Sequence, residues 1–408
     1  MILTCEIVFW ACLAAVAYNY LGYPVFLFLA ASISQVYADF VFLFSRKSRR
    51  AADLEAPQPR IAIIIAAFNE ESVIGERVRN ALAINYPGHL CEILIGLDSP
   101  TDSTAEILSE VDSPRVKIFH FSQRRGKLRV INDLVQISSA EILVFTDANT
   151  HFESDCVARM VRHFSDRRVG VVSGEEVRRT GKGVDPAAER LYWKYESALK
   201  ILESRLGYLH SANGGVYAIR RALFRPQPNL IVEDFQIPIA ARFLGHRVLY
   251  DPEAIAVEEI APTLGSQFER RVRIAAGNFQ TLFSNPNYLN PFKGRPAFAY
   301  WSHRVLRWLT PSMLLSAFIC SVVLLHVTLY QWLLVLQSTF YLMALAGFWR
   351  RKRHESAGVY RIPLYFCTMN AALVLGFFRY LRGRQGAVWK ATPRHLPGPL
   401  PSAKDSKV

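Results

Sequence analysis

The stretch EILVFTDANT, residues 141–150, is a run of strand-forming residues that stops at Asp147, Ala148 and Asn149. Apolar and β-branched residues in such a run are typical of a buried strand. The acid and the amide that follow have three interpretations. Asp and Asn form turns by bonding to nearby backbone, Asp147 can cap a following helix, or both side chains belong to a binding site. Taken alone, the stretch favours the first two interpretations.

Short apolar runs alternate with amphipathic runs around this stretch. Strands are predicted at 60–68, 91–97, 115–121 and 141–146, and helices at 70–82, about 103–111 and about 127–138. Repeated alternation of strand and helix predicts an α/β fold, in which a parallel sheet carries helices on both faces through right-handed crossovers.

Two acids stand at the ends of predicted strands, Asp98 after the second strand and Asp147 after the fourth. In an open parallel sheet, ligands bind outside the carboxyl ends of the strands. The sequence has neither a G-x-G-x-x-G after the first strand nor a G-x-x-x-x-G-K-[ST], the two loops that grip phosphates directly. A sheet without them can hold a diphosphate through a divalent cation, which prefers carboxylate and amide oxygens. Asp147 and Asn149 are therefore the candidate ligands of Mg²⁺ or Mn²⁺.

Two apolar stretches without Asp, Glu, Lys or Arg flank the middle of this chain of 408 residues, at 7–38 and 308–349. Each is longer than the roughly 20 residues that a membrane span needs. Basic residues follow them at 46–50 and 350–353, and such clusters mark the cytoplasmic side and attract anionic lipid. We therefore assign the net charge of +14 mainly to membrane topology and partly to an anionic substrate, and not to nucleic acid.

The membrane segments differ in how clearly the sequence defines them. The first stretch is predicted to be one tilted or broken helix over about 4–28, kinked at NYLGYP (19–24), with the remainder at the interface; two short spans are the alternative. Segments 310–329 and 331–349 are predicted to form a hairpin whose ends are both cytoplasmic. The 17 residues of 362–378 are short for a span, and we expect a re-entrant or interfacial segment and a cytoplasmic C-terminus; a full crossing is the alternative.

These observations predict five parts. They are an N-terminal membrane segment (1–44), a cytoplasmic soluble domain (45–290), an interfacial segment (291–309), C-terminal membrane segments (310–383) and a basic tail (384–408) that is disordered at its end. The six cysteines show no C-x-x-C spacing, so neither a zinc site nor a disulfide framework is supported.

Seven motifs follow one another through the middle of the chain. They are AAFNEE (66–71), LDSPTDST (97–104), RRGKLRVIN (124–132), FTDAN (145–149), SANGGVYAIRR (211–221), VEDFQIPI (232–239) and ERRVRIAAGN (269–278). In this order they resemble the membrane-bound family 2 glycosyltransferases, which include the cellulose, hyaluronan and poly-N-acetylglucosamine synthases. The resemblance covers roughly residues 55–285. It implies a GT-A fold, a Rossmann-like mixed sheet with helices on both faces, with membrane helices at both ends of the chain.

The resemblance also implies a role for each matching residue. The residues implied to bind the nucleotide sugar are Ala67, Asn69, Glu70, Asp98, Lys127, Asp147 and Arg270. Gly214 and Gly215 are implied to bind the acceptor, and Asp147 and Asn149 to bind the metal. Asp234 is implied to be the catalytic base, with Glu233 beside it and Arg273 on the leaving diphosphate. The implied reaction is an inverting transfer from a nucleotide sugar, with a UDP-sugar favoured, to a saccharide or lipid-linked acceptor. It serves polysaccharide or glycolipid synthesis at the bacterial inner membrane.

Two positions depart from the family pattern. Asn149 replaces the second acid of D-x-D, which leaves the strength of metal binding open. The segment around Arg273 lacks the Gln and the Trp of Q-x-x-R-W, which leaves processive synthesis open. A catalytically weak or inactive transferase-like subunit of a polysaccharide assembly or export complex is therefore the alternative function. A nucleotidyltransferase is disfavoured for two reasons. It would have a Gly-rich N-terminal loop, which this sequence lacks, and it would not require the membrane spans that this sequence predicts.

Several candidate residues also have purely structural interpretations. Asp98 is suited to a turn. Glu233 and Asp234 are suited to the N-terminus of a helix, where the dipole favours acids. Lys127 is suited to a solvated helix surface, and we expect no acid near enough to pair with it.

Overall fold

The computed structural model describes residues 2–45, 58–179, 187–226, 231–259, 264–353 and 355–383. The basic cluster at 46–50 and the predicted tail at 384–408 lie outside these ranges. Within these ranges the chain forms two compact units: the first contains the described residues of 2–35, 187–202 and 268–382, and the second contains those of 36–179, 203–267 and Gly383.

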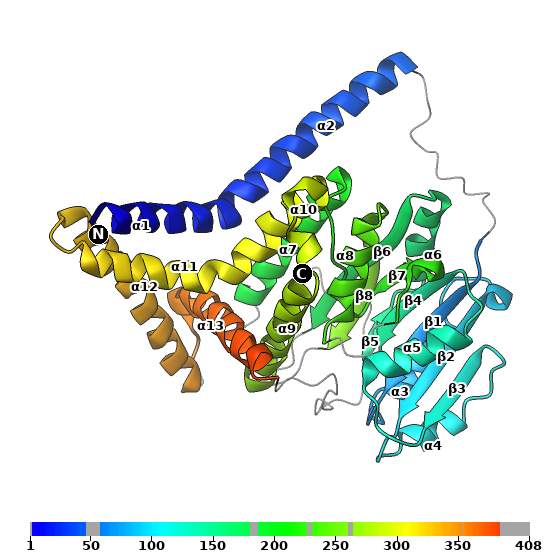
Figure 1. Ribbon diagram of the computed structural model, residues 1–408. Coiled ribbons are helices and arrows are strands. Elements are labelled where there is room, and N and C mark those ends of the chain that lie inside the picture. The colour runs from blue at the N-terminus through cyan, green and yellow to red at the C-terminus, as the bar shows by residue number, and fades with distance from the viewer. Residues whose placement is uncertain are drawn as a thin grey trace. The chain divides into compact units, whose positions relative to one another are not determined.

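The second unit is built on one eight-stranded mixed sheet with the order β3-β2-β1-β4-β7-β6-β8-β5 (Figure 1). The strands are β1 (Ile61–Ala67), β2 (Cys91–Asp98), β3 (Val116–Phe121), β4 (Ile142–Asp147), β5 (Thr150–Phe152), β6 (Val169–Arg179), β7 (Tyr217–Arg220) and β8 (Arg247–Glu259). Strands β3, β2, β1 and β4 run parallel, β7 is antiparallel to β4 and to β6, and β5 is antiparallel to β8. The predicted fold class, a mixed sheet of the α/β type, is confirmed.

Helices cover both faces of this sheet. They are α3 (Ile74–Leu82), α4 (Thr104–Ser109), α5 (Lys127–Ile137), α6 (Cys156–Val161) and α8 (Glu233–Phe243). Successive side chains of a strand point to opposite faces. Ile61, Ile63 and Ile65 accordingly share one core with Val78 of α3 and Met160 of α6, whereas α5 packs against β1 and β2 on the other face. Burial on both sides explains why β1 reads as an unbroken apolar run.

The predicted elements of this unit lie within two residues of the observed ones, except at the start of α3. A helix was predicted from residue 70, but α3 begins at Ile74. The Glu70 carbonyl instead accepts hydrogen bonds from the amides of Val73 and Ile74 in a turn. The amides of Glu70 and Glu71 donate hydrogen bonds to the side chains of Thr104 and Asp102.

Within the described residues the first unit consists of helices. Four helical segments in this part of the chain are long and apolar enough to cross a membrane: Ile2–Phe44, Arg295–Val323, Thr328–Lys352 and Gly358–Leu381. Its elements are α1 (Ile2–Ala17), a π-helical turn (Tyr18–Gly22), α2 (Tyr23–Ser45), α7 (Ala187–Leu206), α9 (Leu264–Ser284), α10 (Arg295–Ala299), a second π-helical turn (Tyr300–Val305), α11 (Leu306–Val323), α12 (Thr328–Lys352) and α13 (Arg361–Leu381). Helices α2, α7 and α9 extend beyond this unit.

Three of the predicted membrane segments have different limits in the structure. The first helix does not end near residue 28 but continues to Ser45, and its change of direction follows the π-helical turn Tyr18–Gly22, which overlaps NYLGYP (Figure 1). The first arm of the predicted hairpin, 310–329, instead spans Arg295–Val323. Helix α13 has 21 residues, about 31 Å at 1.5 Å per residue. A helix of this length is long enough to cross a hydrocarbon core of about 30 Å, whereas the 17 residues predicted from the sequence were not.

The N-terminal helix packs along α11 (Figure 1). Phe9 shares a core with Ala317, Cys320 and Leu324. At the other end of α1 the two π-helical turns meet, because the buried Asn19 amide donates a 2.6 Å hydrogen bond to the Ser302 carbonyl. Single π-helical turns are rare interruptions of α-helices, and here a side chain of one such turn bonds to the backbone of the other.

Candidate active site

Two loops at the carboxyl edge of the sheet are bonded to each other. Asn69 follows β1 with φ at 53°, a left-handed conformation that Asn tolerates better than most residues. Its side chain accepts a 2.8 Å hydrogen bond from the Thr101 amide and donates one of 3.0 Å to the Thr101 hydroxyl. The Glu70 amide donates to the Thr104 hydroxyl at 2.8 Å. The predicted nucleotide-binding residues Asn69 and Glu70 thus lie on a fixed loop, while Ala67 ends β1 with its side chain buried.

Asp98 at the end of β2 is fully buried. Its carboxylate accepts hydrogen bonds from the amides of Arg125 (2.6 Å) and Gly126 (2.9 Å). Gly126 has φ at 89°, a conformation that suits glycine because it has no Cβ. Asp98 therefore fixes the loop that starts α5. Its predicted contact with the nucleotide stays a prediction.

Lys127, the first residue of α5, joins two acids of the site. Its ammonium lies 2.7 Å from Asp147 Oδ1 and also forms an ion pair with Glu233. The expectation that Lys127 has no acid nearby is wrong, because its partners come from β4 and α8, which are distant in sequence. Burial alone lowers the pKa of Lys127, but the two carboxylates raise it well above its ordinary value. Lys127 is therefore a charged bridge between a strand end and a helix N-terminus.

Asp147 and Asn149 lie where β4 ends, with Asp147 next to Ala66 of β1 in the sheet register. The Asp147 side chain is partly exposed, and Asn149 is buried with contacts of its own. Within the described ranges, no three His, Cys, Asp or Glu side chains gather as a metal site. One carboxylate and one amide fit the type of Mg²⁺ or Mn²⁺ site that substrate phosphates and water complete. The metal-ligand roles stay predictions.

Asp234 stands in the first turn of α8 with the glycine loop against it. A Cβ on Gly214 would lie 2.9 Å from Asp234 Oδ2, and a Cβ on Gly215 would lie 2.8 Å from the Thr150 hydroxyl. The Ala212 amide also donates to the Asp234 carbonyl at 2.9 Å. The loop backbone therefore approaches the carboxylate as closely as only glycine allows. The acceptor-binding roles of both glycines stay predictions.

The environment of Asp234 makes it a stronger base than an ordinary carboxylate. Its pKa is raised to about 6, first by burial and then by the neighbouring Glu233 carboxylate, while Lys127 acts in the opposite direction. Glu176 adds a further raising effect and is itself buried, with its carboxylate accepting a 2.7 Å hydrogen bond from Arg178.

Glu176 and Tyr217 were not singled out from the sequence. Tyr217 is fully buried and stacks on Phe145 with ring centroids 4.9 Å apart. Its hydroxyl has no hydrogen-bond partner among the residues that the structure describes. Because Phe145 and Asp147 are two residues apart on β4, Tyr217 lies on the same face of the sheet as Asp147. The apolar neighbours of Tyr217 in the sequence gave no sign of this position.

Comparison with known proteins identifies the domain. Residues 62–225 match the family described as Glycosyl transferase family 2. These residues form a family 2 glycosyltransferase domain. The poly-beta-1,6-N-acetyl-D-glucosamine synthase of Staphylococcus aureus (strain COL) is 24% identical over 274 residues, 64% of this chain and 65% of that protein. The enzyme of the same name from Staphylococcus epidermidis is 22% identical over 272 residues with the same coverage. The chain thus spans 65% of the length of these relatives.

A solved structure confirms the GT-A fold. The mannosyltransferase PcManGT from Pyrobaculum calidifontis, in complex with GDP-Man and Mn²⁺, has a TM-score of 0.66 at 20% identity. The superposition covers 92% of this chain and 99% of that one. Both the family and the fold that the motifs indicated are therefore confirmed.

Other candidate residues belong to the first unit. Arg270 and Arg273 lie on α9 and interact with other residues of the protein. Arg271, between them, donates a 3.3 Å hydrogen bond to the Tyr365 hydroxyl and stacks 4.7 Å from that ring. Glu269 pairs with Arg379 at 2.8 Å. Helix α9 is thus fastened to α13, and the diphosphate roles of Arg270 and Arg273 stay predictions.

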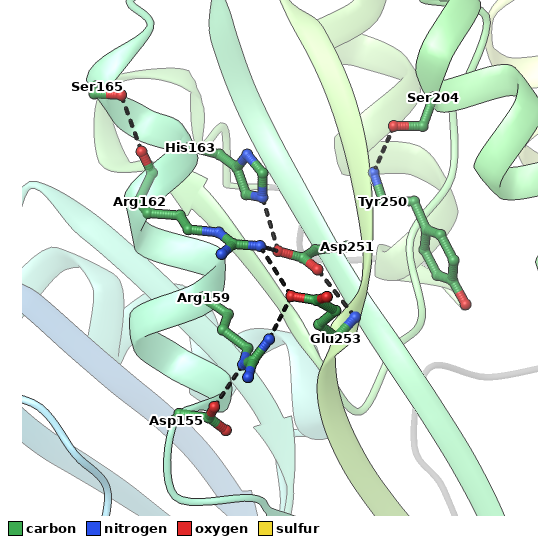
Figure 2. A network of polar contacts seen from close by, with 9 residues as sticks. All are labelled: Asp155, Arg159, Arg162, His163, Ser165, Ser204, Tyr250, Asp251 and Glu253. Carbon is green, nitrogen blue, oxygen red and sulfur yellow. Dashed lines mark hydrogen bonds and ion pairs between the residues drawn. The ribbon is translucent and has the colours of Figure 1, made fainter. Parts of the chain in front are cut away.

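A separate polar network supports the edge of the sheet that follows Asn149 (Figure 2). Asp251 on β8 accepts a hydrogen bond from Arg162 and contacts His163, both at 2.8 Å. These interactions outweigh burial and lower the pKa of Asp251 to about 2. Strand β8 pairs with β5, which begins at Thr150. The network therefore joins α6 and the turn after it to the strand that holds β5 in place.

Proposed function

We propose that this chain transfers a sugar from a nucleotide diphosphate sugar to a hydroxyl group of a saccharide or lipid-linked acceptor, with inversion at the anomeric carbon. The observation that carries the proposal is Asp234: a half-buried residue whose carboxylate packs against Gly214 and whose pKa is raised to about 6. A general base works best when its pKa lies near the operating pH. Asp234 combines this property with a position shortly after the stretch that matches family 2, which ends at residue 225.

In the proposed reaction, Asp234 accepts the proton of the acceptor hydroxyl. The acceptor oxygen forms a bond to the anomeric carbon as the bond from that carbon to the diphosphate breaks. Glu233 raises the pKa of Asp234, which favours proton transfer. The raised pKa of Asp234 and the close approach of Gly214 support this assignment.

The donor site is proposed to include the loops after β1 and β2, together with Lys127. Arg270 and Arg273 supply charge-assisted hydrogen bonds to the leaving diphosphate, because guanidinium groups match phosphate geometry. A divalent cation held by Asp147 and Asn149 supplies charge stabilisation at the same diphosphate. The names of the staphylococcal relatives favour an N-acetylglucosamine polysaccharide as the product. UDP is proposed as the nucleotide from the resemblance of the sequence motifs.

The four apolar helices support action at a membrane. The bacterial relatives favour the cell membrane, with the family 2 domain in the cytoplasm, where nucleotide sugars are made. In this arrangement the basic residues at 350–353 face the cytoplasm, as such clusters usually do.

The test is a transfer assay with the full chain purified in detergent. Radiolabelled nucleotide sugars, UDP-N-acetylglucosamine among them, are offered with Mn²⁺, Mg²⁺ or EDTA, and the products are separated by size. We expect transfer by the wild type, a loss of about 10²–10⁴-fold in Asp234→Asn, and full activity in Asp112→Asn, an exposed control. Nucleotide binding without transfer from any donor would reject the proposal and favour the inactive-subunit alternative.

A further inference from the structure

The Lys127 ammonium lies between two carboxylates that different elements deliver. Asp147 Oδ1, at the end of β4, is 2.7 Å away, and Glu233, at the start of α8, is the second partner. All three side chains are mostly buried, with exposed fractions of 24%, 29% and 12% for Lys127, Asp147 and Glu233. One positive charge thus balances two negative charges in a partly desolvated site, where an ion pair is screened less than at the surface.

The backbone and the side chain of Lys127 are held differently. Asp98 fixes the backbone before Lys127 through the amides of Arg125 and Gly126. The ammonium sits at the end of a flexible four-carbon stem and acts as a compact point charge. The charge can therefore leave Asp147 by a change of side-chain conformation, with the loop and α5 unchanged.

A lysine ammonium and a divalent cation both use a carboxylate oxygen as their partner. In the observed arrangement Oδ1 of Asp147, the single carboxylate of the proposed metal site, is already engaged by Lys127. A cation that binds Asp147 must replace this contact or share the carboxylate against the repulsion of a nearby positive charge.

We propose that Lys127 competes with the divalent cation for Asp147, so that the ion pair of Lys127 sets how tightly the site binds the metal. This inference rests on the proposed function, because it takes Asp147 and Asn149 as the metal ligands. When the metal binds, the hydrogen bond from Lys127 to Asp147 is lost and a metal–oxygen bond forms. Lys127 keeps its protons and its ion pair with Glu233. The site thereby exchanges one bound cation for another.

The competition is measured by titrating Mn²⁺ alone, without nucleotide, into the full chain in nanodiscs. The variant Lys127→Met removes the competing charge, and we expect it to bind Mn²⁺ about tenfold more tightly than the wild type, as loss of one nearby positive charge predicts. Lys127→Gln is a second neutral variant that retains hydrogen-bonding capacity, and the same gain is expected. Lys127→Arg keeps the charge and should stay within about threefold of the wild type.

The matched control is Lys117→Met. Lys117 forms a 2.9 Å ion pair with Glu92 on the β2–β3 side of the sheet, so its loss should leave Mn²⁺ binding unchanged. Thermal unfolding shows whether each variant is folded. If Lys127→Met does not fold, the Mn²⁺ affinity of Lys127→Gln tests the competition instead.

Mn²⁺ affinity within twofold of the wild type in the folded neutral variants would overturn the competition. Absence of Mn²⁺ binding in the wild type and in the neutral variants would overturn it as well, together with the metal part of the proposed function. Transfer of sugar in EDTA, measured in the assay above, separates that result from failure of the transferase function itself.

Discussion

Asp98 and Gly126 are joined by a 2.9 Å hydrogen bond from the glycine amide to the buried carboxylate. This contact connects the end of β2 to the start of α5, and Lys127 follows directly. The carboxylate at the edge of the sheet thus orders the loop whose next residue pairs with Asp147. One buried acid therefore fixes the starting point of the charged bridge across the site.

Replacing this acid should loosen the loop. In Asp98→Asn, the side-chain nitrogen cannot accept one of the two amide hydrogen bonds, which leaves a buried donor without a partner. We expect the free energy of unfolding to fall by about 1.5–3 kcal/mol, as is typical of hydrogen bonds to charged groups. Thermal unfolding in detergent measures this, with Asp112→Asn as the exposed control. Unchanged stability would show that the Asp98 carboxylate does not hold the loop.

Adding one methyl group to the glycine loop should displace the proposed base. The Cβ of Gly214→Ala would lie 2.9 Å from Asp234 Oδ2, so the carboxylate must move. We expect kcat to fall about 10²-fold, the effect of a displacement near 1 Å, with donor binding retained. Gly265→Ala, whose Cβ meets nothing within 4 Å, is the control. If both variants keep the wild-type kcat, Gly214 does not position Asp234.

The pKa of about 6 at Asp234 predicts an acid limb in the rate profile. A base must be unprotonated to accept a proton, so kcat/KM should decline about tenfold per pH unit below pH 6 and level off above it. Measurement of kcat/KM between pH 4.5 and 8 tests this. A limb centred near 4, the ordinary value for Asp, would contradict it.

The same pKa predicts that the charge of Asp234 costs stability. Because folding raises this pKa above its ordinary value of 3.8, the folded state disfavours the carboxylate, and the cost develops as the pH rises from about 4 to about 6. Asp234→Asn should be more stable than the wild type at pH 8 by about 1–3 kcal/mol, since each pKa unit corresponds to about 1.4 kcal/mol. The two proteins should converge near pH 4. Equal unfolding temperatures at both pH values would contradict this.

Tyr217 carries a buried hydroxyl without a hydrogen-bond partner in the described part of the chain. Tyr217→Phe removes the hydroxyl and keeps the stacking on Phe145, so the free energy of unfolding should rise by about 1 kcal/mol. Tyr86→Phe is the matched control. The Tyr86 hydroxyl donates a 2.6 Å hydrogen bond to the Pro59 carbonyl, and its loss should destabilise the protein. A destabilised Tyr217→Phe would show that this hydroxyl is satisfied after all.

Asn149→Asp adds a second carboxylate to the proposed metal site. We expect about tenfold tighter Mn²⁺ binding, because an anionic oxygen replaces a neutral one. The metal-free variant should be less stable, since Asn149 is buried and an unpaired buried charge is costly. A Mn²⁺ titration and thermal unfolding test the two effects. Weaker Mn²⁺ binding would remove Asn149 from the metal ligands.

The parallel half of the sheet was predictable because its signals are local. The apolar run of β1 and the strand-ending acids of β2 and β4 are visible within a few residues. The antiparallel strand β7 is four residues long and has no such pattern, so its place between β4 and β6 emerged only from the structure. The acids at 70 and 71 were taken for a helix start, whereas loop contacts decide their conformation.

The site residues divide in the same way. Asp147 and Asp234 were found from motifs, because each lies in a short stretch with a characteristic order. The partners of Lys127 were missed, since only the folded sheet brings β4 and α8 to the start of α5. Glu176 and Tyr217 lie on strands β6 and β7, where sequence alternation does not reveal which neighbour each will face. Chemistry that depends on contacts between distant elements is absent from local patterns.

The contact between the two π-helical turns also limits when the helical unit can assemble during protein synthesis. Asn19 and Ser302 are 283 residues apart, and chains are synthesised at about 5–20 residues per second. The Asn19 side chain is therefore made roughly 14–57 s before the carbonyl to which it donates. During that interval the first helix has emerged but its polar partner does not exist. Assembly of the helical unit must then wait for the second half of the chain, however quickly the first helix forms.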